Sequence, residues 1–189
     1  MERDSIYLRN DQMNQLFRIE LYNHHQTDRL ESLCTELAPS YPQLERITPV
    51  RFYKIGCQQK ERLQTILWDK HSPLLHDPVI EEINWSENRP ELLGGEPTVI
   101  VETSPKPGVT DNPGHVICEA LELLKLPANA ASGTLYLFYG KITPQNSLLI
   151  VQQHLANALI HQITAWEYQE YLALDRFQKV EMPNAGTLH

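Results

Sequence analysis

The sequence LFRIEL at residues 16–21 has a counterpart in VIVE at residues 99–102, and their glutamates, Glu20 and Glu102, are 82 positions apart. Further matches follow at similar spacing: Leu33, Cys34 and Leu37 with Ile117, Cys118 and Leu121, Gly56 with Gly140, His71 with His154, and Trp85 with Trp166. Self-similarity at a nearly fixed period is the signature of a repeated structural unit. We therefore predict a chain built from two similar halves.

Each half is predicted to run strand, helix, strand, helix, strand. In the first helix, Leu30, Leu33, Cys34 and Leu37 recur at i, i+3, i+4 and i+7, which places them on one helical face. The corresponding helix of the second half has Asp111 or Asn112 as its N-cap and Pro113 in its first turn. The closing strands are predicted at residues 79–83 and 159–163.

Strands separated by helices favour an α/β (α+β) fold with helices on one side of a sheet. The other sheet face is then bare, and an apolar bare face has to pack on something. We therefore predict two tandem ferredoxin-like-type units that close over each other as a pseudo-dimer, with the helices on the outer faces. The predicted boundaries are 1–85 for the first unit, 86–97 for a linker, 98–166 for the second unit and 167–189 for a C-terminal helix and tail.

The composition argues against several classes of protein. Lys and Arg number 16 against 24 Asp and Glu, and this net charge of −8 disfavours binding to nucleic acid phosphates. No run of about eighteen apolar residues occurs, so we expect no membrane-spanning helix, and no apolar stretch that would suggest a signal peptide follows Met1. The three cysteines lie far apart, which is typical of reduced thiols, and we predict a cytoplasmic protein.

The sequence has few patterns that indicate catalysis. It has no Cys-x-x-Cys, His-Glu-x-x-His or Gly-x-Ser-x-Gly motif, and we expect its histidines to be structural or solvent-facing. Cys118 lies on the inward stripe of its helix, where a buried thiol is the default. Glu20 and Glu102 could form a carboxylate pair across a two-fold axis, but two solvent-facing positions are the simpler interpretation. We predict no catalytic, cofactor-binding or metal-binding residue.

The segment SPKPGVTDNPG at residues 104–114 joins a predicted strand to a predicted helix. Its prolines fix the backbone and its glycines free it. One interpretation is a plain connection with a strong helix cap. The other is a shaped recognition loop, because loops often carry function.

Residues 106–111 (KPGVTD), followed by Gly114 and the pair Ala120-Leu121, resemble the small bridging subunit of bacterial phosphoribosylformylglycinamidine synthase. In that family a strand runs into a Lys-x-Gly-Val-x-Asp loop and then a helix. Residues 155–160 (LANALI) are similar to the family's pattern at the end of its second helix, and residues 72–80 are a weaker echo of it. The tandem layout also resembles the N-terminal region of the large single-chain form of the enzyme.

That enzyme uses ATP and glutamine to convert formylglycinamide ribonucleotide into its amidine. The resemblance implies a non-catalytic module that bridges the synthetase and glutaminase parts, whether as a separate subunit or as part of a longer chain. It implies that ATP and Mg²⁺ bind elsewhere in the enzyme, and that Lys106, Gly108 and Asp111 are inter-domain contacts. Two rival classes stay open. One is a paired regulatory module with its ligand where the units meet, and the other is a small ferredoxin-like isomerase or oxygenase.

Overall fold

The computed structural model describes residues 15–23, 28–69, 74–85 and 95–174. Residues 1–14, His71, most of the predicted linker and the tail after residue 174 lie outside the described residues. The first half contains β1 (Gln15–Asn23), α1 (Asp28–Leu37), β2 (Leu44–Cys57), α2 (Lys60–Leu67) and β3 (Glu81–Trp85). The second contains β4 (Val99–Pro105), α3 (Asn112–Leu123), β5 (Asn129–Gly140), α4 (Pro144–Ile150), a π-helical turn (Val151–Leu155), β6 (His161–Glu167) and α5 (Tyr168–Ala173). The predicted order of elements is therefore observed in both halves.

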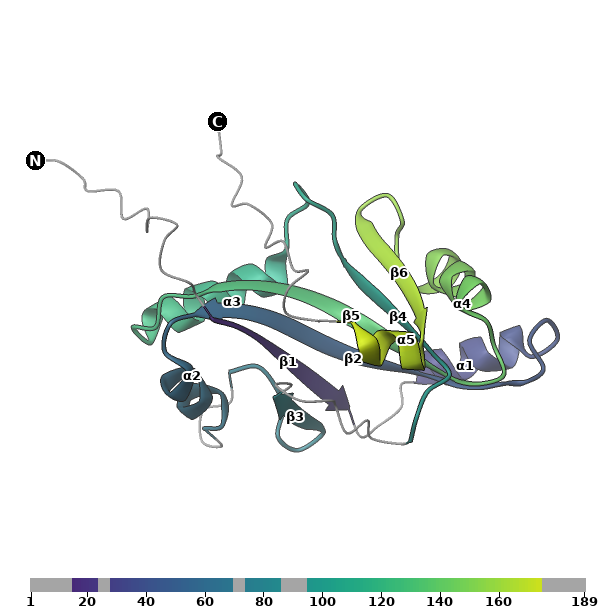
Figure 1. The fold of residues 1–189 in the computed structure, drawn as a ribbon, viewed down its shortest axis with the longest axis horizontal. Coiled ribbons are helices and arrows are strands. Elements are labelled where there is room, and N and C mark those ends of the chain that lie inside the picture. Colours follow the sequence, from purple (N-terminus) through teal and green to yellow (C-terminus); the bar gives the residue numbers. More distant parts are fainter. Residues whose placement is uncertain (1–14, 24–27, 70–73, 86–94, 175–189) are drawn as a thin grey trace, which may run out of the picture.

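The strands form one six-stranded antiparallel sheet in the order β3-β1-β2-β5-β4-β6. Within each half the first strand lies between the closing strand and the middle strand. The two halves join where β2 pairs with β5, from Leu44 opposite Gly140 to Gly56 opposite Asn129. The prediction that the halves close over each other face to face is therefore wrong. They lie edge to edge, because backbone pairing of these two long strands makes one continuous sheet (Figure 1).

Helices α1 to α4 cover one face of this sheet. Leu63 of α2 and Leu121 of α3 pack in a core with Ile55 of β2, while α1 and α4 pack in a second core with Ile47 of the same strand. Ile47 and Ile55 differ by an even number of positions along the strand, so they point to the same face. Helix α5 lies on the opposite face, where its buried Tyr171 packs with the cluster that contains Phe52. Helices thus occupy both faces, but four of these five share one.

The helices are exchanged between the halves. The core over β1 contains α2 of the first half and α3 of the second, with Leu63 and Leu67 beside Ile117 and Leu121. The core over β4 contains α1 of the first half and α4 of the second. Figure 1 shows α2 and α3 toward one end of the sheet and α1 and α4 toward the other. Each core is therefore incomplete without a helix from the other half.

The closing strands begin two residues later than predicted, at Glu81 and His161. A turn precedes each one, in which the side chain of Asp77 or Asn157 accepts a hydrogen bond from the amide two residues on. The predicted equivalence of Trp85 and Trp166 is also wrong by one residue. Trp85 lies opposite Ile19, whereas Ala165 lies opposite Val101. Trp85 therefore packs under the helices, and Trp166 packs on Tyr171 of the other face.

In the part of the chain that the structure describes, no helix has the length and apolar character needed to cross a membrane.

The exchanged helices predict that neither half folds alone. A fragment of residues 1–85 lacks Ile117 and Leu121, whose burial is worth about 3–6 kcal/mol, a large part of the roughly 5–15 kcal/mol that stabilises a small domain. We expect fragments 1–85 and 86–189 to show no cooperative thermal unfolding separately and to regain it when mixed, as followed by circular dichroism. A cooperative transition in either isolated fragment would contradict the exchange.

Candidate functional site

The segment that carries the resemblance is an exposed turn of defined geometry. The amide of Val109 donates to the carbonyl of Lys106 at 3.0 Å, which closes a four-residue turn. Pro107 occupies the second position, and Gly108 occupies the third with φ of +83°. These are the requirements of a type II turn, in which the third residue needs the left-handed conformation that glycine adopts without strain. The sequence KPGV thus specifies the shape of the loop.

Lys106 ties this turn to the one before β6. Its Nζ donates to the carbonyl of Ala158 at 2.7 Å, and its backbone amide donates to the carbonyl of Ile160 at 2.9 Å. Residues 106–111 and 155–160, the two segments that resemble the bridging subunit, are therefore in direct contact. The sequence alone did not place them together.

Asp111 has an internal role. One carboxylate oxygen accepts from the amide of Gly114 at 3.0 Å and from the hydroxyl of Ser132 at 2.6 Å, and the other accepts from the amide of Ser132 at 2.6 Å. The predicted N-cap of α3 is confirmed. Since three donors engage its carboxylate, Asp111 anchors the loop to β5, and a contact with a neighbouring domain stays a prediction for this residue.

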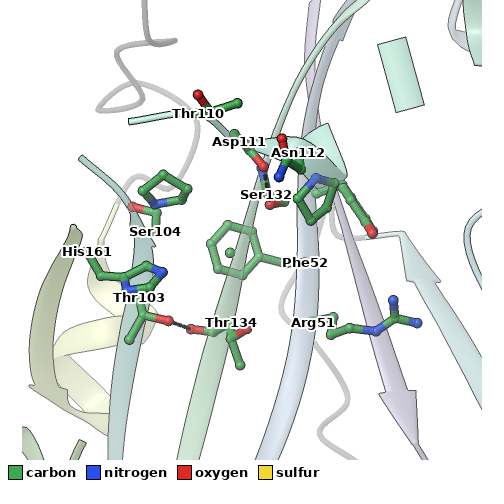
Figure 2. A pocket seen from close by; sticks show the side chains of 14 residues that line it. Arg51, Phe52, Thr103, Ser104, Thr110, Asp111, Asn112, Ser132, Thr134 and His161 are labelled. Carbon is green, nitrogen blue, oxygen red and sulfur yellow. Dashed lines mark hydrogen bonds between the residues drawn. The ribbon is translucent and has the colours of Figure 1, made fainter. Parts of the chain in front are cut away.

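A pocket of about 330 Å³ opens beside this loop (Figure 2). It lies over the sheet where Arg51 of β2 pairs with Thr134 of β5, so it sits where the two halves meet. Hydroxyl side chains dominate its polar lining: Tyr53, Thr103, Ser104, Thr110, Ser132 and Thr134. Hydroxyl groups both donate and accept hydrogen bonds, so this lining is suited to a small polar molecule.

The ionisable groups at this pocket already have partners. Nη2 of Arg51 contacts both carboxylate oxygens of Glu81, at 2.6 and 2.8 Å. Asp111 caps α3, and Nδ1 of His161 lies 3.1 Å from the carbonyl of Asn157. The pocket therefore does not bring together a set of free acidic and basic groups, as acid–base catalysis would need.

The opposite sheet face holds an ionic cluster that the sequence did not predict. Arg18 donates from Nε to Glu20 at 3.0 Å, from Nη1 to Glu102 at 3.1 Å and from Nη2 to the hydroxyl of Tyr171 at 2.9 Å. Lys54 donates to Glu102 at 3.0 Å, and Tyr22 donates to Glu20 at 2.8 Å. The expectation that Glu20 and Glu102 face solvent is wrong: Glu20 is 0% exposed, and Arg18 links the two carboxylates.

The electrostatics of the cluster keep Arg18 and Glu102 charged. Burial alone would lower the pKa of Arg18, but Tyr171, Glu102 and Glu20 raise it overall, so the guanidinium stays charged. Burial would raise the pKa of Glu102, but Arg18 and Lys54 outweigh it and hold that pKa below the usual value. A carboxylate with a lowered pKa is a poor proton donor or acceptor near neutral pH. The cluster is therefore suited to holding strands together.

The thiols are also suited to a structural role. Burial raises the pKa of Cys34, Cys57 and Cys118, so each stays protonated and weakly nucleophilic at neutral pH. Cys118 accepts a hydrogen bond from the amide of Ala130 at 3.1 Å. Across the ranges that the structure describes, no three His, Cys, Asp or Glu side chains gather closely enough to hold a metal ion.

A scan against protein-family models finds no match for this chain, and a search of the curated proteins finds no relative. The geometry of the loop, the pocket and the ionic cluster is therefore the basis for interpreting the site.

The ionic cluster predicts a stability loss in acid. A carboxylate whose pKa is lowered by folding stabilises the native state fully above its unfolded pKa, and this contribution is lost as the pH falls through the folded value. We expect Glu102→Gln to lower the free energy of unfolding by about 1–3 kcal/mol at neutral pH, because a charged hydrogen-bond acceptor is removed. We also expect the variant to lose less stability than the wild type between about pH 5 and pH 3.

Urea unfolding at each pH measures this effect. Glu82→Gln is the matched control, because Glu82 is exposed on β3 and should leave the pH profile unchanged. Equal acid sensitivity of Glu102→Gln and the wild type would contradict the ion pairing.

Proposed function

We propose that this chain is a non-catalytic bridging module of phosphoribosylformylglycinamidine synthase. In this role it organises the synthetase and glutaminase parts during amidation of formylglycinamide ribonucleotide. ATP, Mg²⁺ and the substrates bind to those other parts, and the enzyme works in the cytoplasm. Lys106, Gly108 and Asp111 belong to the inter-domain contact loop.

The observation that carries this proposal is the contact between the two resembling segments. Lys106 joins residues 106–111 to residues 155–160 through two hydrogen bonds, to Ala158 and Ile160. Segments that are distant in sequence thus form one exposed corner, where Lys106, Pro107, Gly108 and Leu159 are all exposed. Two segments that matched the family by chance would have no reason to lie in contact. Their contact in one exposed surface therefore supports a role of this surface in recognising a neighbouring domain.

The tandem ferredoxin-like-type duplication is part of this proposal, with the two units forming a pseudo-dimer through β2 and β5. Both halves have the same order of strands within the sheet. Both closing strands follow the same turn, in which the carbonyl of Asp77 or Asn157 accepts from the amides three and four residues on. Leu33 and Ile117, which the repeat makes equivalent, are both buried in the exchanged helices. These shared details support a duplicated unit.

The state of the ionisable groups favours this module over an isomerase or oxygenase. Glu20 and Glu102 share Arg18, and Asp111 caps a helix. A catalytic acid or base has to exchange a proton with its substrate, which groups held in this way do poorly.

The experiment measures binding of the chain to the synthetase and glutaminase parts, together with glutamine-dependent amidine synthesis. We expect Lys106→Ala to weaken binding by about tenfold, as loss of an interface anchor does, and to reduce coupled synthesis. Asp111→Ala should weaken binding as well and also lower the melting temperature, because it removes a cap worth about 0.5–2 kcal/mol. The chain alone should show neither glutaminase nor ATPase activity.

Lys141→Ala is the control, because Lys141 is exposed in a different loop, after β5. If Lys106→Ala and Asp111→Ala bind and support synthesis like the wild type, the loop serves only to cap α3 and is not an inter-domain contact. Turnover by the isolated chain would contradict the non-catalytic assignment.

The pocket at Arg51 and Thr134 favours a second candidate, a regulatory module that binds a small ligand where the halves meet. A melting-temperature screen against nucleotides and amino acids tests it, since a ligand at 100 times its Kd stabilises by about 2.7 kcal/mol. Under the bridging proposal we expect no stabilising ligand. A stabilising ligand whose effect disappears in Thr134→Phe, where the larger side chain fills the pocket, would favour the regulatory module.

A further inference from the structure

The two edges of the sheet are built differently. β3 and β6 are the edge strands, so among the described residues each pairs with a strand on one side only (Figure 1). β3 has five residues and begins with the adjacent carboxylates Glu81 and Glu82, and short, charged edges resist pairing with further strands. β6 has seven residues, with no proline and no charged side chain between His161 and Glu167. It therefore lacks the protection that β3 has.

The backbone of β6 directs alternate residues toward the outer edge. Just beyond its ladder with β4, the amide of Lys106 donates to the carbonyl of Ile160 at 2.9 Å, and the bonded pair that flanks the other end is also even-numbered. Bonded and non-bonded pairs alternate along an antiparallel ladder, so the even-numbered residues of β6 are the ones bonded to β4. The amides and carbonyls of Ile163 and Ala165 therefore point outward.

Only the centre of this edge is open to a partner strand. At its two ends the outward amides have partners within the chain: the amide of His161 donates to the carbonyl of Asn157 at 2.9 Å, and that of Glu167 donates to Oε2 of Glu170 at 3.3 Å. All seven residues of β6 are at least partly exposed, whereas residues 99–101 of the neighbouring β4 are 0% exposed. The outward groups of Ile163 and Ala165 thus lie on an accessible strand.

The sequence of β6, HQITAWE, is complementary to itself when it is paired antiparallel about Thr164. In that register Ile163 lies opposite Ala165 of the second strand, and each such pair exchanges two backbone hydrogen bonds through the outward groups. At both ends His161 lies opposite Glu167, so an imidazole meets a carboxylate and no two like charges face each other. Thr164 lies opposite its own copy on the axis.

We propose that β6 is the edge at which two copies of this chain join, by antiparallel pairing about a two-fold axis at Thr164. The second copy is the occupant because the charges and the outward backbone groups of β6 match those of β6 itself. Pairing of β6 with β3 of another copy would be head-to-tail, which builds open filaments, and would add the carboxylates of Glu81 and Glu82. The pairing rests on β6 alone and does not depend on the proposed function.

Sedimentation velocity on the purified chain at micromolar concentration tests the dimer. We expect a species of twice the mass of one chain. Thr164→Lys should raise the dimer dissociation constant by about tenfold or more, because it places two like charges opposite each other on the axis. Asn84→Lys is the matched control, because Asn84 lies opposite Glu20 on β3 just as Thr164 lies opposite Glu102 on β6. It should dimerise like the wild type, and both variants should keep the circular dichroism spectrum of the folded chain.

A cysteine at the axis tests the register independently of any loss of affinity. In the proposed pairing the two Thr164 residues form a non-bonded pair with Cα atoms about 4.5 Å apart, which a disulfide spans. Thr164→Cys should therefore form an intermolecular disulfide on mild oxidation. Gln162→Cys should not, because its copy lies four residues along the partner strand, about 13 Å away. The wild type, with its own three cysteines, is the blank.

Three results would overturn the proposal. A wild-type chain that stays monomeric at these concentrations has no such edge contact. A dimer that Asn84→Lys weakens and Thr164→Lys does not would place the contact at β3, and masses that grow with concentration beyond the dimer would indicate head-to-tail pairing. Disulfide formation by Gln162→Cys and not by Thr164→Cys would exclude the axis at Thr164.

Discussion

The pairing of β2 with β5 is the constraint on which the rest of the structure depends. It joins the halves through an antiparallel ladder between two long strands, and it puts β3 and β6 at the two edges of the sheet. Because the sheet is continuous, α1 of the first half can pack over β4 of the second, and α3 of the second half can pack over β1 of the first. At the end of the ladder Gly140 has φ of +93°, and a Cβ there would collide with the carbonyl oxygen of Gln43. Only glycine therefore fits at position 140, at this end of the β2–β5 pairing.

The ionic cluster on the opposite face makes this arrangement specific. Arg18 and Glu20 alternate along β1 with Ile19, which is buried under the helices. Because side chains alternate between faces, a slip of one residue would move these charges into an apolar core. Arg18 also reaches Glu102 of the second half and Tyr171 of α5, so its contacts join both halves and the final helix. Leaving one partner of a buried ion pair uncompensated costs about 3–5 kcal/mol, so alternative registers are strongly disfavoured.

Local patterns in the sequence predicted the elements well, because their signals are local. The apolar spacing from Leu30 to Leu37 predicted α1, and Asp111 with Pro113 predicted the start of α3. The strand starts at 79 and 159 were wrong, because Val79 and Leu159 have the composition of strand residues but lie in turns that Asp77 and Asn157 cap. The sequence alone does not show such a turn, because it does not tell whether the amides of the next residues bond to the Asp or Asn side chain or to a neighbouring strand.

Long-range arrangement was predicted less well. Edge-to-edge and face-to-face packing bury similar apolar faces, so the apolar pattern does not choose between them. The two arrangements differ in whether β2 pairs with β5 through backbone hydrogen bonds. Every residue except proline has both the backbone donor and the backbone acceptor, so the sequence does not show which strands pair. The usable signal for the ionic cluster was Arg18, a charged residue between the apolar residues Phe17 and Ile19 of a strand that is expected to be buried. A buried cation needs acidic partners on the same face of the sheet. Glu20, two residues along the strand, and Glu102, its match in the predicted repeat, are the candidates for those partners.

The two halves also differ in the length of one connection. The connection from β1 to α1 covers residues 24–27, whereas that from β4 to α3 covers residues 106–111 and is two residues longer. This difference accounts for the change in repeat spacing from 82 at Glu20 to 84 at Leu33. The longer connection contains the type II turn at Gly108 and also Lys106, which donates to the carbonyl of Ala158. The loop that supports the bridging proposal is therefore the part of the second half that has no counterpart of equal length in the first.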